Sequence, residues 1–281
     1  LFIAFYRPGI SHILFAALTI RVFFLILGHY FISLPDSTAD ANSFEQLSWT
    51  FAKDGFSNYL SYYPGQSPKL LSWLIGFLYL LFGQSKLMAQ SISLLFGIGT
   101  VFLGWNLARM IWDNQIAKKV AWILVLFPSL ILYSILLLRE IYIIFFILLA
   151  LHGVFYWIKT YNLKSYFITI FGFTCATFFH GAMIIGAITF VAISGFISLK
   201  KIFKSLNNSK IDLKTLIVVL LAITILILFY MNKIQVAYIN NFNYILNINN
   251  LLLKAFQSTA GTAAYPAMTI PQTGYELLYK I

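Results

Sequence analysis

Five ionisable side chains that lie far apart in the chain are expected at the same boundary between lipid and water. A carboxylate at such a place can remove the proton of an acceptor hydroxyl group, and arginine binds phosphate through ionic hydrogen bonds. Only eight residues of the chain are acidic, and six of them fall on this side of the topology given below. We therefore take the five as a candidate site: Asp36, Asp40, Arg139, Glu140 and His180.

Each of these residues also has a structural interpretation, which stays open. Asp36 or Asp40 could cap the helix that follows, because aspartate is favoured at a helix start. Arg139 and Glu140 could form a local ion pair that marks the interface, and His180, alone, is typical of a hydrogen-bonded turn. A functional site is favoured because all five residues are expected at the same boundary, and ionisable residues that line a membrane cavity are usually functional.

The composition indicates an integral membrane protein. Sixty per cent of the residues are hydrophobic and 10% are charged, whereas soluble domains carry roughly 25% charged residues. The net charge of +11 does not indicate nucleic-acid binding, because the basic residues are spread between apolar runs. The single cysteine excludes an internal disulfide. No His, Cys and carboxylate cluster has the spacing of metal ligands, so we predict neither a metal site nor a cofactor.

The charge of the loops predicts an all-α bundle of about seven transmembrane spans. With the N-terminus in the cytoplasm, 11 basic residues lie on the cytoplasmic side and 7 lie outside, although the outside segments are longer; this agrees with the positive-inside rule. Arg21 falls within the first span and must find a partner in the bundle. The predicted spans are 11–33, 88–107, 119–138, 141–158, 165–179, 182–199 and 215–231.

Three further segments are expected on the outer face. The outer loop 34–87 contains an apolar stretch, 70–82, that is too short to span and is typical of a re-entrant or interfacial helix. Within 40–55, apolar residues at 44, 47 and 51 indicate a surface helix. The tail 235–256 has the pattern of an amphipathic helix. We divide the chain into a transmembrane domain, 1–231, and an outer-face segment, 232–281, and expect it to be a fragment that lacks later spans.

Two stretches carry a resemblance to a known family. One lies in the outer loop: the segment 40–55, then Pro-Lys-Leu-Leu-Ser-Trp (68–73), then Leu-Leu-Phe-Gly (80–83). The other is Phe-Pro-Ser-Leu (127–130), followed by Arg139 and Glu-Ile-Tyr-Ile-Ile-Phe-Phe (140–146). Together they resemble the GT-C membrane glycosyltransferases, and within them the protein mannosyltransferase and aminoarabinose transferase group. The similarity covers about residues 10–200.

The resemblance implies a role for each matching residue. Asp40 falls on the loop aspartate that acts as the catalytic base, and Glu140 falls on a second acidic position that is aspartate in the family. Arg139 lies near the family's arginine. Ser67 stands where the family has a lysine that contacts phosphate, and Lys69, two residues later, could supply that cation. With Asp36 and His180, Arg139 and Lys69 form the expected substrate-binding set.

The expected function is transfer of a sugar from a polyprenyl-phosphate donor to a lipid-linked or protein acceptor. The expected location is a bacterial inner membrane, with the site facing the periplasm. A weaker resemblance, through Arg139 and the His-Gly-Ala at 180–182, is to polymerases of the O-antigen and exopolysaccharide type. A non-enzymatic alternative is a lipid or ion transporter, although transporters usually bury such carboxylates near the midplane.

Overall fold

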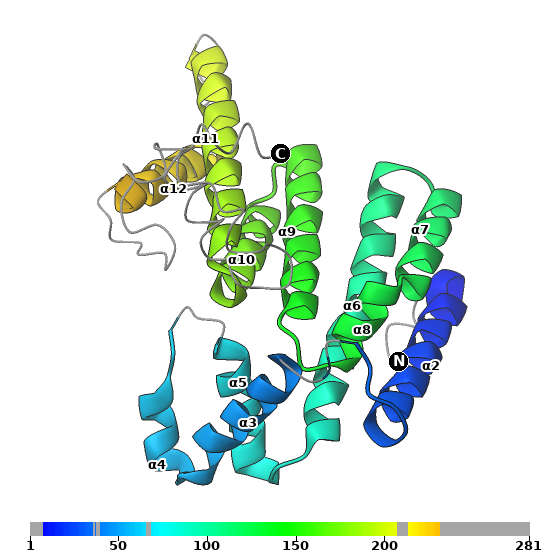
Figure 1. Cartoon of the computed structure of the whole chain (residues 1–281). Coiled ribbons are helices and arrows are strands. Elements are labelled where there is room, and N and C mark those ends of the chain that lie inside the picture. The colour runs from blue at the N-terminus through cyan, green and yellow to red at the C-terminus, as the bar shows by residue number, and fades with distance from the viewer. Residues whose placement is uncertain (1–7, 36, 38–39, 66–68, 207–212, 231–281) are drawn as a thin grey trace, which may run out of the picture. The chain divides into compact units, whose positions relative to one another are not determined.

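The computed structural model describes residues 8–35, 37, 40–65, 69–206 and 213–230, and these form helices joined by short connections (Figure 1). In chain order the helices are α2 (Pro8–Tyr30), α3 (Asp40–Lys53), α4 (Gly55–Tyr59), η1 (Leu60–Tyr62), α5 (Leu70–Phe82), α6 (Lys86–Ile111), α7 (Asn114–Leu126), α8 (Pro128–Ile135), α9 (Glu140–Thr160), α10 (Leu163–Phe179), η2 (Gly181–Met183), α11 (Ile184–Leu206) and α12 (Leu213–Tyr230). The chain divides into two compact units, Leu1–Ala222 and Ile223–Ile281, and helices α2 to α11 belong to the first.

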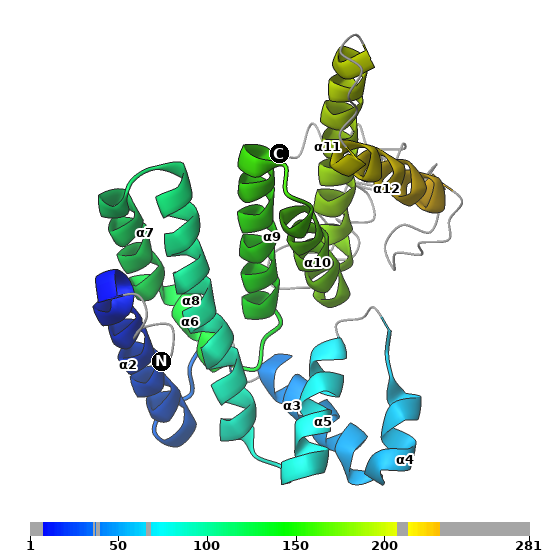
Figure 2. The same cartoon turned by 180° about the vertical axis from the view of Figure 1, so that it is seen from behind.

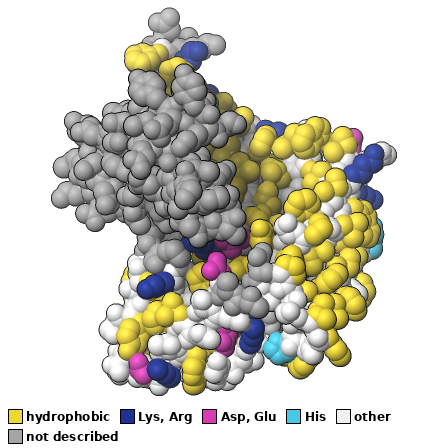
Figure 3. Space-filling model, in the orientation of Figure 1, with side chains coloured by type: hydrophobic (Ala, Val, Ile, Leu, Met, Phe, Trp, Pro, Cys, Tyr) yellow, Lys and Arg dark blue, Asp and Glu magenta, His cyan; other side chains and the backbone are white. Residues whose placement is uncertain are grey.

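The protein is an all-helical membrane protein in its described part. Four helices are long and apolar enough to cross a bilayer: Gly9–Tyr30, Lys86–Ile111, Glu140–Thr160 and Gly181–Phe203. They match four of the seven predicted spans. Hydrophobic side chains cover much of the face over α2, α6, α7 and α8 (Figure 3), as expected for a surface in contact with lipid.

The other three predicted spans differ from simple crossings. The span predicted at 119–138 is two helices, α7 and α8, bent by 60° at the break before Pro128. Proline has no N–H group and clashes with the preceding turn, so a helix breaks or kinks there. Helix α10 and the stretch Thr215–Thr224 of α12 are apolar but shorter than the four helices above. The tail helix predicted at 235–256 lies outside the described residues.

Helix α6 is the centre of the bundle, because it packs against α2, α7, α8 and α9. Helices α9 and α10 form an antiparallel pair (Figures 1 and 2). The end of α2 and the starts of α6 and α9 lie at one end of the bundle, where α3, α4 and α5 form a separate layer. The short connection between α6 and α7 and the end of α9 lie at the opposite end.

The outer loop folds largely as its sequence predicts. The apolar stretch 70–82 is helix α5, and the predicted surface helix is α3. Phe51 of the predicted apolar stripe is buried, as are Ala41, Ser48 and Ala52, and Phe44 packs against the hydrophobic core. Helix α3 packs on α5, with Ser72 Oγ donating a hydrogen bond to the carbonyl of Phe44 at 2.9 Å.

Helix α4 is fastened to α5 by an aromatic pair. Tyr59 and Trp73 stack with ring centroids 4.9 Å apart, and Trp73 Nε1 donates to the carbonyl of Tyr59 at 3.3 Å. Tyr62 Oη donates to Asp54 Oδ2 at 2.7 Å, and this hydrogen bond to the Asp54 carboxylate raises the pKa of the Tyr62 phenol. The outer loop is therefore a packed layer that can hold α3 in a fixed place.

Two glycines let α9 and α10 approach closely. A Cβ atom at Gly172 would lie 2.7 Å from the backbone nitrogen of Ala150, and one at Gly153 would lie 2.8 Å from that of Thr169. Both distances are shorter than a Cβ atom ever approaches a non-bonded atom in a protein, so neither position can carry a larger residue without a shift of the backbone. Small residues at helix contacts are typical of membrane bundles, where close backbone packing stabilises helix pairs.

We expect Gly172→Ala to lower the free energy of unfolding by about 1–3 kcal/mol, because α9 and α10 must move apart to admit the methyl group. Thermal unfolding of the detergent-solubilised protein measures this change. The matched control is Gly9→Ala, since a Cβ at Gly9 would meet no heavy atom within 4 Å. An equal effect of the two substitutions would show that the α9–α10 contact is looser than described.

Candidate functional site

Asp40 is the first residue of α3 and is exposed to solvent. A negative charge is favourable at a helix start because of the helix dipole, so the structural interpretation of Asp40 remains compatible with a chemical one. Lys86 Nζ, at the start of α6, donates to Asn42 Oδ1 at 3.0 Å and holds the same turn of α3. Asp36, the other predicted aspartate, lies outside the described residues.

Packing brings the start of α3 to the start of α9. Ala41, which follows Asp40, is 1% exposed and belongs to one hydrophobic cluster with Leu136 and Leu138. Leu138 directly precedes Arg139. Residues almost 100 positions apart in the sequence are thus close in the fold, as the topology predicted. The figures agree, with the start of α3 beside the connection that leads into α9 (Figures 1 and 2).

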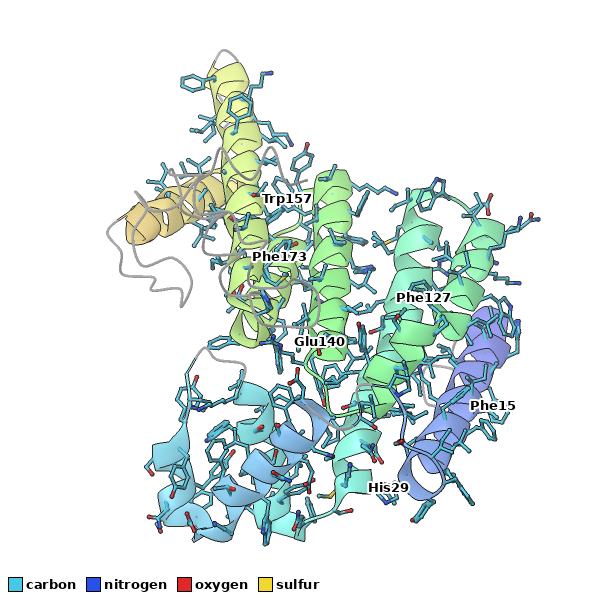
Figure 4. The ribbon with its side chains drawn as sticks, in the orientation of Figure 1. Phe15, His29, Phe127, Glu140, Trp157 and Phe173 are labelled. Carbon is cyan, nitrogen blue, oxygen red and sulfur yellow. The ribbon has the colours of Figure 1, made fainter. Side chains whose placement is uncertain are left out.

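Arg139 and Glu140 form an ion pair at the start of α9. Arg139 Nε lies 3.4 Å from Glu140 Oε1, and the two side chains are 25% and 38% exposed. In Figure 4, Glu140 lies at the end of α9 that is nearest the α3–α5 layer. The predicted local ion pair is therefore real, but such a partly exposed contact stabilises little. It uses Nε alone, which leaves the terminal nitrogens of the guanidinium to bind another anion.

His180 and Lys69 also lie at helix ends. His180 ends α10 with an extended backbone, and its backbone N–H donates to the carbonyl of Ala176 at 2.9 Å while its carbonyl accepts from Met183 N at 3.0 Å. These bonds make it the turn residue that one interpretation expected. Lys69 is exposed and precedes α5, where its carbonyl accepts from Trp73 N at 3.0 Å.

A pocket of about 400 Å³ lies between α5, α6, α9 and α10. Its lining is almost wholly apolar and aromatic, and its volume is in the range of about 300–1,000 Å³ that is usual for ligand pockets. The lining residues are Tyr63, Leu70, Leu71, Trp73, Leu74, Ile75, Leu78, Ile92, Phe96, Tyr142, Phe146, Cys175, Phe178 and Phe179.

Three of the predicted site residues lie within two positions of a lining residue in the sequence. Lys69 precedes the lining residue Leu70, His180 follows the lining residue Phe179, and Glu140 lies two residues before Tyr142. We call Asp40, Lys69, Arg139, Glu140 and His180 the charged rim. The structure thus combines a charged rim with an apolar pocket. A ligand that has both a charged group and a long apolar chain fits this arrangement best.

Tyr142, in the wall of the pocket, has its hydroxyl group satisfied within the protein. Tyr142 stacks on Phe179 with ring centroids 5.3 Å apart, and its hydroxyl group forms a buried 2.9 Å hydrogen bond with Ser93 Oγ. The side chain of Tyr142 therefore presents mainly its ring to the pocket. Leu74 and Phe178, which also line it, are 41% and 38% exposed, so the pocket is open on that side.

The pocket was not predicted from the sequence. One feature of the sequence that points to it is the spacing of Tyr142 and Phe146, which are four residues apart and therefore lie on one face of α9. That spacing equally fits a core contact. In the described residues, no three His, Cys, Asp or Glu side chains are grouped so that they could hold a metal ion.

Comparison of the chain with protein-family models, with curated proteins and with solved structures gave no match. The resemblance to GT-C glycosyltransferases therefore stays a prediction, which rests on the motifs in the sequence. The geometry of the charged rim and the pocket provides independent grounds for judging it.

Proposed function

We propose that the protein is a membrane glycosyltransferase with a GT-C-like bundle of seven spans. It would move a sugar from a polyprenyl-phosphate donor to a lipid-linked or protein acceptor at the periplasmic face of a bacterial inner membrane. The observation that carries this proposal is the apolar pocket of about 400 Å³, whose lining includes the direct sequence neighbours of Lys69 and His180. A polyprenyl phosphate has the matching chemistry, an apolar chain joined to an anionic head.

The roles of the residues follow from their charges. Part of the polyprenyl chain would occupy the pocket, and the guanidinium of Arg139 would bind the phosphate by charge-assisted hydrogen bonds, with Lys69 as a second cation. Asp40 would accept the proton of the acceptor hydroxyl group. The hydroxyl oxygen then bonds to the anomeric carbon as the bond from that carbon to the phosphate oxygen breaks, and the polyprenyl phosphate leaves with the electron pair.

Glu140 and His180 would complete the site from the other side of the rim. Glu140 holds Arg139 through the 3.4 Å contact, and it would orient the guanidinium toward the phosphate. His180 would contact the sugar, since it follows the pocket residue Phe179 directly. Asp36, which lies outside the described residues, was placed in the same substrate-binding set by the sequence.

The proposed sidedness rests on the distribution of basic residues. Arg109, Lys118 and Lys119 lie near the α6–α7 connection, at the end of the bundle opposite the charged rim. Lys159, Lys164, Lys200 and Lys201 lie in the end turns of α9, α10 and α11 that the topology puts on that side. The positive-inside rule makes that end cytoplasmic, so the rim faces the periplasm.

The two alternatives predict different products. A polysaccharide polymerase would use the same kind of donor but would join repeat units, so its product would be a ladder of lengths. A transporter would move its substrate across the membrane without making a covalent product. The position of Asp40 and Glu140 favours an enzyme over a transporter, because both lie at helix starts at one end of the bundle rather than near its midplane.

The test is to incubate membranes that contain the protein with polyprenyl phosphates carrying a radiolabelled sugar. We expect label to move into a lipid-linked or protein product, and no such transfer in membranes that lack the protein. Sealed vesicles run in parallel measure flux of the donor. Flux without a covalent product would overturn the proposal in favour of a transporter, and a ladder of products would favour the polymerase.

The single cysteine of the chain provides a direct probe of the pocket. Cys175 lines it, so an apolar maleimide should label this thiol, and polyprenyl phosphate should slow the labelling. At a lipid concentration ten times its Kd, about nine-tenths of the sites are occupied, and the rate should fall about tenfold. Mass spectrometry of the purified protein measures the rate.

The matched control moves the thiol out of the pocket. Ile193 on α11 is 54% exposed and is not a lining residue, so the double variant Cys175→Ala, Ile193→Cys should react at the same rate with and without the lipid. Equal protection of both thiols would mean that the lipid only dilutes the reagent. No protection of Cys175 would show that the lipid does not bind in the pocket.

A further inference from the structure

Arg21 lies in the middle of the first span and is 0% exposed. A buried charge is costly unless polar groups surround it. Its guanidinium reaches across the bundle to α7: Nη2 donates to the carbonyl of Leu124 at 3.3 Å, and Nη1 donates to that of Val125 at 3.4 Å. The partner of Arg21 is therefore the end of a helix rather than an acidic side chain in the described residues.

The break at Pro128 explains why these carbonyls are available. Helix α7 ends at Leu126, and the last four carbonyls of a helix have no partner within it. Pro128, which would donate to Leu124 in a continuous helix, has no N–H group. The cation also lies at the negative end of the α7 dipole, where it is stabilised. Figure 4 shows Phe127 at the junction of α7 and α8.

A second buried polar side chain holds the far end of α8. Gln90 on α6 donates through Nε2 to the carbonyl of Ile135, the last residue of α8, at 2.9 Å. Between the two, α6 approaches α8 closely at Gly97, where a Cβ atom would lie 3.3 Å from Arg21 Nε and closer still to Ser134 Cβ. The end of α7, two residues before α8 begins, is thus held by Arg21 of α2, and the end of α8 is held by Gln90 of α6.

The charged rim begins just after this fixed helix. Residues 136–138 connect α8 to Arg139, and all three are buried, with exposures of 4%, 1% and 6%. Three residues span at most about 10–11 Å, so the place of α8 limits where Arg139 and Glu140 can lie. Leu136 and Leu138 belong to the same hydrophobic cluster as Ala41, so the place of α8 also affects how the rim groups lie relative to Asp40.

We infer that Arg21 and Gln90 are positioning residues: Arg21 holds the end of α7 that leads into α8, Gln90 holds the last residue of α8, and together they set where Arg139 and Glu140 lie relative to Asp40. The catalytic consequence of this role rests on the proposed function, because it assumes that the charged rim transfers a sugar. The arrangement itself can be measured without activity, because a loosened α8 frees the backbone of the segment that follows it.

The experiment is hydrogen exchange of the full chain in lipid nanodiscs, followed by mass spectrometry. In Arg21→Met, which keeps the side-chain bulk but removes every donor, amides of 136–142 should exchange on the order of tenfold faster. Arg21→Lys keeps the charge and should recover part of the protection. Gln90→Met tests the other end of α8 and leaves Arg21 in place, so it remains informative if Arg21→Met does not fold.

Thr169→Val is the matched control. Thr169 on α10 is fully buried, and its hydroxyl group donates to the carbonyl of Ser165 at 3.0 Å, so its loss removes a comparable buried hydrogen bond away from α8. It should leave exchange at 136–142 unchanged. Unchanged exchange there in Gln90→Met and in a folded Arg21 variant would overturn the inference. If the variants exchange faster but the unchanged protein transfers no sugar, the positioning role is supported and only the proposed function is contradicted.

Discussion

Replacing Asp40 with asparagine should abolish sugar transfer and leave the amount of protein in the membrane unchanged. Asparagine has nearly the same shape and is also favoured at a helix start, and Asp40 is exposed, so α3 should form as before. Asparagine cannot accept the proton of the acceptor hydroxyl group. Loss of a general base costs about 10²- to 10⁴-fold in rate, which an assay with radiolabelled donor can resolve.

The matched control for this variant is Asp54→Asn. Asp54 is an exposed carboxylate of the same outer layer, but it follows the far end of α3 and accepts a hydrogen bond from Tyr62. We expect this variant to transfer sugar at the rate of the unchanged protein. Normal transfer by Asp40→Asn would remove Asp40 from the mechanism. Equal losses in both variants would point to a general effect of the outer layer instead.

Replacing Arg139 with alanine should weaken the use of the donor. A charge-assisted hydrogen bond to phosphate is about twice as strong as a neutral one, and its loss should lower kcat/KM for the donor by about 10- to 100-fold. Arg139→Lys should recover only part of this loss, because lysine cannot make the paired contact of a planar guanidinium. Kinetics with varied donor and fixed acceptor measure the change.

Arg109→Ala is the control for charge alone. Arg109 lies over the ring of Trp105 at 4.7 Å, near the opposite end of the bundle from the rim, and its loss should leave KM for the donor unchanged. If Arg139→Ala lowered transfer from every donor equally and also lowered the protein level, the Arg139–Glu140 pair would be a structural ion pair and no more.

The pattern of apolar residues predicted the existence and approximate bounds of helices α3 and α5. The stretch 70–82 was expected to be a short helix and is α5, Leu70–Phe82. The helix predicted within 40–55 is α3, and its buried residues include Ala41, Ser48 and Ala52 beside Phe51 of the apolar stripe. Spacing shows that a face is apolar, whereas the partner helix decides which residues of that face are covered, and a single sequence does not identify the partner.

The break between α7 and α8 shows a different limit. An apolar run over 119–138 predicts one span if only hydropathy is read, but Pro128 divides it. The bend is stabilised by Arg21, which lies 103 residues before Leu124. The sequence predicts that Arg21 has a partner in the bundle but does not identify it. Backbone carbonyls that lack a donor because a proline follows cannot be recognised from composition or residue spacing.

The candidate site was partly predictable for a related reason. Loop charge and alternation of spans predicted that Asp40, Arg139, Glu140 and His180 share one boundary, and in the structure the starts of α3 and α9 lie together there. The pocket beneath was not predictable. It is formed by side chains of four helices, and its shape depends on how closely those helices pack.

The most direct test of the account is thiol labelling of the rim from one side of the membrane. In a Cys175→Ala background, single cysteines at positions 40, 140 and 180 are treated with a membrane-impermeant maleimide in spheroplasts, and separately in inside-out vesicles. The account predicts that all three react in spheroplasts and none in inside-out vesicles. If position 40 and position 140 reacted from opposite sides, the rim would not exist as one site and the proposed enzyme would be contradicted.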